Sequence, residues 1–120
     1  MGDALTIEVR HEQDLVIVTA AGEIDISTVP RIRECLFDLA ARGGPLVADL
    51  DRVSFIDSTG LAALVGTAKR ANACGGGLYV VCGQPKIRQL FRLTGLDGRI
   101  PLASTLDEAL EALAAGRVTS

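Results

Sequence analysis

The stretch that most constrains this sequence is Val53-Ser54-Phe55-Ile56-Asp57-Ser58-Thr59-Gly60-Leu61. Its apolar part ends at Asp57, and an apolar pattern with helical spacing begins at Leu61, so an extended run is predicted to turn directly into a helix. The turn places Ser58 at the amino end of that helix, where backbone N–H groups and the helix dipole favour negative charge and would hold a phosphate. Ser58 is therefore either a simple helix cap or a phosphate site, and the choice between the two largely decides the function.

Outward from this segment, strand-like runs alternate with helical apolar patterns. Strands are expected over residues 5–10, 15–20, 46–50, 78–82 and 99–102, and the polar link after the first suggests a hairpin. Helices are expected from a cap at Ser27 or Thr28 to a stop at 42–45, over 61–71, from Pro85 to Gly95, and from a capping-box pattern at 105–108 to Gly116. Strands that alternate with helices predict an α/β domain with a largely parallel sheet.

Length and composition limit the class of protein. The chain has 120 residues, of which 48 % are hydrophobic and 3 % aromatic, so one domain with an aliphatic core is expected. We expect this domain to span residues 1–120, with its core at about 5–114 and a frayed tail at 117–120. A net charge of −3 argues against a nucleic-acid-binding protein, and no apolar stretch is long enough to span a membrane.

The three cysteines, Cys35, Cys74 and Cys82, are odd in number and form no Cys-x-x-Cys pair. This pattern argues against a disulfide framework or a zinc site, and a cytoplasmic protein without metal or cofactor is expected. Buried, inert thiols are the predicted role, and a redox pair between Cys74 and Cys82 is the alternative.

Three motifs stand in order along the chain: Gly22-Glu23-Ile24-Asp25, Phe55-Ile56-Asp57-Ser58-Thr59-Gly60-Leu61 and Leu90-Phe91-Arg92-Leu93-Thr94-Gly95-Leu96. With this order and spacing, the chain resembles the anti-sigma factor antagonists of the STAS domain family. The resemblance implies a single STAS-like domain of α/β class, with a mostly parallel mixed sheet of about five strands and with about four helices.

The resemblance also implies a function and partners. In the family, the serine that matches Ser58 is phosphorylated by an anti-sigma factor that is also a serine kinase. The unphosphorylated protein binds this kinase and frees its sigma factor, phosphorylation breaks the complex, and a PP2C-type phosphatase restores it. A stress-response or sporulation pathway, a monomer or weak dimer, and no catalytic residues are therefore expected. Thr59, where serine is also common, is a second and weaker candidate acceptor.

The residues predicted to bind the partner lie in the first two motifs: Glu23, Asp25, Ser27, Asp57, Ser58, Thr59 and Gly60. Because the carboxyl ends of parallel strands share one edge of a sheet, Asp25 and Asp57 are expected near Ser58, where a phosphate would repel them. Simpler interpretations stay open. Ser58 is an N-cap whose loss costs about 1 kcal/mol, and Asp57 stabilises the helix dipole. Gly60 allows either tight packing or the close approach of a kinase or nucleotide.

Two other classes of function would need residues that this sequence lacks. A serine hydrolase needs a base and a Gly-x-Ser-x-Gly elbow, whereas the only histidine, His11, is predicted in the first hairpin. A nucleotide-binding module would need a phosphate-binding loop, but Gly75-Gly76-Gly77 lacks its lysine and is typical of a helix stop. A STAS subunit of a transport or another signalling complex is a further alternative.

The third predicted helix carries Lys86, Arg88 and Arg92 and no acidic residue. A solvated helix face is the simpler interpretation of these charges, and docking of an acidic partner is the alternative.

Overall fold

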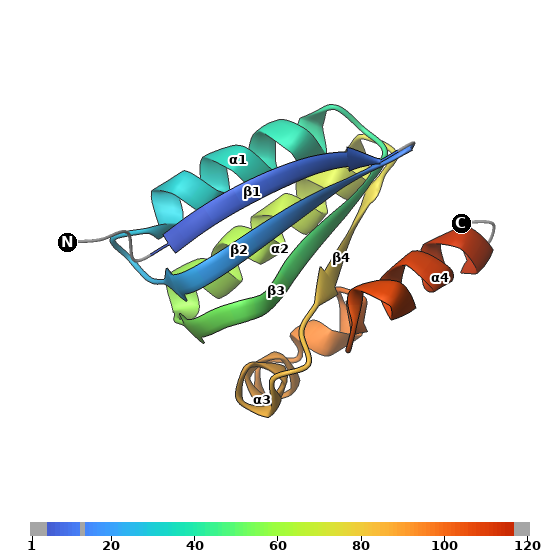
Figure 1. Cartoon of the computed structure of the whole chain (residues 1–120). Coiled ribbons are helices and arrows are strands. Elements are labelled where there is room, and N and C mark those ends of the chain that lie inside the picture. The colour runs from blue at the N-terminus through green and yellow to red at the C-terminus, as the bar shows by residue number, and fades with distance from the viewer. Residues whose placement is uncertain (1–4, 13, 117–120) are drawn as a thin grey trace.

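The structure, a computed structural model, describes residues 5–12 and 14–116 of the chain (Figure 1). Its centre is a five-stranded sheet in the order β1-β2-β3-β4-β5, in which β1 is antiparallel to β2 and all other neighbours are parallel. The strands are β1 (Leu5–Glu12), β2 (Leu15–Ile24), β3 (Pro45–Ile56), β4 (Gly77–Val81) and β5 (Leu102–Ala103). The mostly parallel mixed sheet predicted from the sequence is confirmed.

Helices cover both faces of this sheet. They are α1 (Val29–Ala41), α2 (Ser58–Ala73), α3 (Pro85–Leu93) and α4 (Leu106–Gly116), with a short 3-10 turn, η1 (Leu96–Gly98). α1 and α2 lie side by side on one face, and α4 packs on the other (Figure 1). Alternation along the strands divides the core accordingly: Val18 and Ala48 belong to the larger cluster, while Ile17 and Val47 pack with α4.

The two central strands are longer than the apolar runs predicted. β2 continues to Ile24 and β3 to Ile56, and these two residues pair with each other at the end of the ladder. Charged residues interrupt the apolar pattern there, Glu23 in β2 and Asp51 and Arg52 in β3, so hydrophobicity alone ended the predicted strands too early. The pairing of β2 with β3 shifts register twice in this part, as at a β-bulge. Gly22, next to one shift, has φ 117°, a backbone conformation that favours glycine. His11 also belongs to β1 and not to the connecting loop.

β4 is much shorter than β3. It pairs with β3 only as far as Asp49, so residues 50–56 have no strand on that side within the described chain. The segment before α3 takes this place: Gln84 Nε2 donates to the carbonyl of Asp51 at 2.9 Å and to that of Val53, and Gly83 N–H donates to Asp51 Oδ1 at 2.8 Å. α3 is thereby anchored beside the carboxyl-terminal half of β3.

The three cysteines are free thiols in different surroundings. Cys82 is buried and Cys35 half-buried, and burial raises the pKa of both thiols. Cys74 is exposed, so the prediction of buried thiols is wrong for this residue. Cys74 and Cys82 flank the two ends of β4, about 16 Å of strand, which is too far apart for a disulfide.

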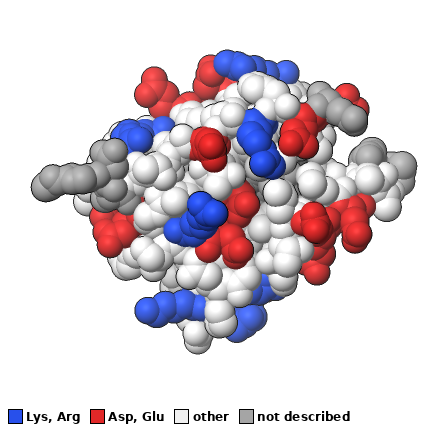
Figure 2. Space-filling view, viewed as in Figure 1, with Lys and Arg blue, Asp and Glu red and all other residues white. Residues whose placement is uncertain are grey.

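None of the helices formed by residues 5–12 and 14–116 combines the length and the hydrophobicity that a membrane span requires. The tail expected to fray, residues 117–120, lies outside the described residues. Figure 2 shows acidic and basic side chains interspersed over one face of the molecule.

Candidate functional site

The carboxyl ends of β2 and β3 bring the first two sequence motifs together. Ile24 pairs with Ile56, and the N–H of Asp57 donates to the carbonyl of Ile24 at 3.1 Å. The next residue after each strand is an aspartate, so Asp25 and Asp57 are neighbours at this edge. The sequence correctly predicts that the two carboxylates share the edge on which Ser58 lies.

Asp57 is the N-cap of α2. Its backbone is extended, and Oδ1 accepts hydrogen bonds from the N–H of Thr59 at 2.9 Å, the N–H of Gly60 at 3.2 Å and the hydroxyl of Thr59 at 2.5 Å. One carboxylate oxygen thus satisfies two N–H groups of the first turn. The interpretation of Ser58 as the cap is therefore wrong, because Asp57 already performs that role.

Ser58 is the first residue of α2 and is exposed. Its hydroxyl has no hydrogen-bond partner within the described part of the chain, whereas the half-buried Thr59 hydroxyl donates to Asp57. A phosphate on Ser58 would find the N–H groups of Thr59 and Gly60 already bound to a carboxylate. The expectation that these groups hold a phosphate is therefore not supported, but the Ser58 oxygen is freely presented to solvent.

Gly60 is buried at the point where α2 meets the strand ends. A Cβ at this position would lie 2.6 Å from Cγ1 of Ile56 and 2.7 Å from Cγ2 of Ile24. The missing side chain therefore lets the helix start directly against the sheet. The position that a side chain would take faces the core and is filled by Ile56 and Ile24. The alternative in which a kinase or nucleotide approaches the backbone at Gly60 is therefore wrong.

The loop after β2 is held by its own polar side chains. Asp25 Oδ1 accepts from the N–H of Ser27 at 3.0 Å, the hydroxyl of Ser27 at 2.7 Å and the N–H of Thr28 at 3.1 Å. The hydroxyl of Thr28 donates to the carbonyl of Glu23 at 2.8 Å, and the residue is the N-cap of α1 without a side-chain cap bond. This geometry is an ordinary turn that leaves Glu23 and Ser27 exposed.

Both carboxylates of the site are ionised at neutral pH. The hydrogen bond from the Ser27 side chain holds the pKa of Asp25 below its ordinary value. The Thr59 hydroxyl does the same for the pKa of Asp57, while the nearby charge of Asp25 acts in the opposite direction. An exposed hydroxyl therefore stands beside two anionic carboxylates.

No histidine lies near Ser58 within the described part of the chain. His11 pairs with Val16 at the opposite end of β2, and the strand from Val16 to Ile24 spans about 26 Å. No group of three metal-ligating side chains is found within the described residues either. The histidine-activated serine of a hydrolase is therefore not formed at this site.

Sequence reasoning missed the apolar residues around this site. Ile26, at the tip of the loop after β2, and Leu93, on α3, are each 74 % exposed, and Phe55 is 49 % exposed. Ile26 is detectable in retrospect, because it stands alone between polar turn residues. Phe55 and Leu93 belong to the second and third sequence motifs, but no local pattern showed that their side chains are exposed.

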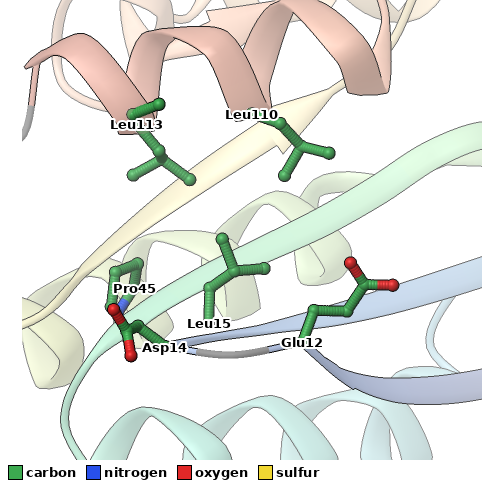
Figure 3. A pocket seen from close by; sticks show the side chains of 7 residues that line it. Glu12, Asp14, Leu15, Pro45, Leu110 and Leu113 are labelled. Atoms are coloured by element: carbon green, nitrogen blue, oxygen red, sulfur yellow. The ribbon is translucent and has the colours of Figure 1, made fainter.

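A hollow of about 270 Å³ lies at the other end of the sheet (Figure 3). There Leu110 and Leu113 of α4 point toward Leu15 and Pro45 at the starts of β2 and β3, and Glu12 lies beside them. It is a seam where α4 closes incompletely on the sheet, far from Ser58.

Comparison with known proteins agrees with this fold. The STAS domain model matches residues 6–109. The chain is 36% identical over 100 residues to the anti-sigma-B factor antagonist of Bacillus subtilis (strain 168), covering 83% of this chain and 92% of the relative. It is 37% identical over 93 residues to the protein of the same name from Staphylococcus aureus (strain NCTC 8325 / PS 47), covering 77% of this chain and 86% of that one.

Solved structures show the same architecture. An anti-sigma factor antagonist from Mycobacterium paratuberculosis matches with a TM-score of 0.85 and 35% identity, covering 92% of this chain and 94% of the other. Unphosphorylated SpoIIAA, an anti-sigma factor antagonist, matches with a TM-score of 0.73 at 23% identity over 91% of this chain and 96% of its own, a likeness of fold alone. The chain therefore belongs to the STAS domain family and, within it, is similar to the anti-sigma factor antagonists.

Proposed function

We propose that this chain is an anti-sigma factor antagonist that is switched at Ser58. The unphosphorylated form binds an anti-sigma factor with serine kinase activity and so releases a sigma factor, and phosphorylation of Ser58 ends the complex. The observation that carries the proposal is the exposed Ser58 hydroxyl, which has no partner within the described residues and lies at the start of α2. The names of the relatives support the antagonist role.

The proposed switch acts through local charge. A phosphate adds a charge of about −1.5 to −2 at pH 7, beside the carboxylates of Asp25 and Asp57. Because Asp57 already occupies the N–H groups of Thr59 and Gly60, the phosphate projects outward instead of docking on the helix. A partner surface shaped for the neutral hydroxyl then meets extra volume and negative charge, and no change of fold is required.

The other predicted site residues receive roles consistent with their positions. Glu23, Ser27 and Thr59 belong to the partner-binding surface with the two aspartates, while Gly60 acts from inside by seating α2. An exposed phosphoserine is accessible to a PP2C-type phosphatase, which completes the cycle. In this proposal the protein is a substrate and a binding partner, it works in the cytoplasm without a cofactor, and it is a monomer or weak dimer.

Phosphosite mass spectrometry tests this proposal. Purified protein is incubated with ATP and each candidate anti-sigma kinase, beside Ser58→Ala and Thr59→Ala variants. We expect phosphate on Ser58 in the wild type and in Thr59→Ala, and none in Ser58→Ala. A Ser58→Asp variant should bind the same kinase more weakly. Absence of phosphate with every kinase, or wild-type affinity of Ser58→Asp, would contradict the switch.

A further inference from the structure

A groove of about 370 Å³ lies between the end of β3 and α3. Ser54 and Phe55 line one wall, and Lys86, Leu90 and Leu93 line the other. The groove exists because β4 ends early and α3 stands beside the unpaired half of β3 in place of a strand.

The groove is unusually apolar for an open surface. Leu93 and Phe55 are two of only four large hydrophobic side chains that are exposed within the described residues. Exposed apolar groups that gather at one hollow are typical of an interaction site, whereas isolated ones are common on any protein. A third, Ile26, belongs to the loop after β2, and only Val9, on the edge strand β1, lies elsewhere.

The groove is continuous with the Ser58 loop. The residues of its first wall lead directly through Ile56 into Asp57 and Ser58, with no intervening element. A partner that covers Ser58 and extends toward α3 would therefore reach the groove next. This position makes it an extension of the proposed partner surface.

The charges along this surface change sign. Lys86 is exposed at the α3 wall, and both ion pairs of the described residues lie elsewhere, on β1 and at the end of α1. At the other end of the surface stand the ionised carboxylates of Asp25 and Asp57. A partner that complements this surface presents, in order, a carboxylate, apolar side chains and a cation.

We propose that this groove is a second docking point for the anti-sigma factor. It takes a segment of the anti-sigma factor whose apolar side chains lie between Phe55 and Leu93 and whose carboxylate pairs with Lys86. This inference rests on the proposed function and adds that binding affinity and switching come from different parts of the surface. The groove supplies affinity, and Ser58 supplies the switch.

The test uses the anti-sigma kinase that phosphorylates the wild-type protein. Leu93→Ala and Lys86→Glu alter the groove without touching the Ser58 loop. Val9→Ala, on β1, and Lys69→Glu, on the exposed side of α2, are controls of the same chemical kind. Because all four side chains are exposed, thermal unfolding should remain as in the wild type.

We expect each groove variant to raise the Kd for the kinase about tenfold, and each control to stay within about twofold. The groove variants should also raise KM for Ser58 phosphorylation while kcat stays unchanged, since the reacting serine is intact. Wild-type Kd and KM in both groove variants would overturn the groove proposal while leaving the switch at Ser58 in place.

Two further outcomes would distinguish failure of the proposed function from failure of the groove proposal. If the wild type is neither bound nor phosphorylated by any anti-sigma kinase, the proposed function itself fails, and the groove proposal with it. If sedimentation shows that the free chain dimerises and that Leu93→Ala breaks the dimer without changing the Kd for the kinase, the occupant is a second copy and the inference is wrong.

Discussion

At the scale of single residues, Asp57 closes the first turn of α2 through three hydrogen bonds, while the adjacent Ser58 hydroxyl makes none with the described residues. In the loop after β2, Asp25 likewise accepts from the N–H groups of Ser27 and Thr28, but there the Ser27 hydroxyl also donates to Asp25. The aspartates shape the two loops, and the hydroxyl of Ser58 is left over for chemistry.

Substitutions of Ser58 and of Asp57 should therefore differ in their effect on thermal stability. Ser58→Ala should leave the melting temperature within about 1 °C of the wild type, because no cap bond is lost. Asp57→Ala should lower it by about 4 °C or more, and Asp57→Asn, which keeps a capping oxygen, should lower it less. Thermal unfolding followed by circular dichroism measures all three. An equal loss for Ser58→Ala and Asp57→Ala would show that the cap is wrongly assigned.

The sequence predicted where these residues meet but not which of them caps the helix. Aspartate and serine are both good caps, so residue type alone does not choose between Asp57 and Ser58. The choice depends on where the ladder of β3 ends, and the N–H of Asp57 is still bound to Ile24 of the neighbouring strand. That hydrogen bond is a tertiary contact, which no local pattern reveals.

At the scale of elements, the unequal lengths of β3 and β4 shape the surface beside the site. The apolar run 46–50 predicted a strand, and the pattern along the chain predicted the order of strands and helices. Neither predicted how far β3 extends beyond residue 50. Pairing with β2 continues β3 past the charged residues Asp51 and Arg52 to Ile56. The helix over 85–93 was predicted at its correct place in the chain, whereas its position against β3 depends on the contacts of Gln84.

Gln84 should matter for stability more than its polar nature suggests. Its amide donates to the carbonyls of Asp51 and Val53, so Gln84→Ala removes both bonds and should lower the free energy of unfolding by about 1–2 kcal/mol. Gln84→Glu, which replaces the donor with an anion, should cost more. Urea denaturation measures both. Unchanged stability would mean that the buried Ile87 and Phe91 alone hold α3 in place.

At the scale of the whole molecule, one sheet supports two cores of different size. The order of elements and the α/β class were predictable because alternating apolar patterns leave few topologies. The larger core packs under α1 and α2, and α4 covers a smaller one on the other face. The division between these faces was not predictable, since the inner strands are apolar on both sides.

The free energy of unfolding should decrease in acid because the carboxylates of Asp25 and Asp57 become protonated. The pKa values of Asp25 and Asp57 are lower in the folded chain than in the unfolded one, so protonation favours unfolding. Their contribution is complete above the unfolded value near 4 and is lost as pH falls through the lower folded values. Urea denaturation between about pH 7 and pH 3 should show this loss. The double variant Asp25→Asn, Asp57→Asn should flatten it, and an equally steep decline in that variant would exclude these carboxylates.

The free hydroxyl of Ser58 has a consequence for the lifetime of the protein in a cell. Proteases and chaperones act on the small unfolded fraction of a protein, so any group that changes folding stability also changes abundance. Phosphorylation of Ser58 breaks no hydrogen bond within the described residues, and solvent screens the added charge at this exposed position, so that fraction changes little. The modified and unmodified molecules would then be degraded at the same rate, and the total pool would stay constant while the ratio of the two forms alone carried the signal.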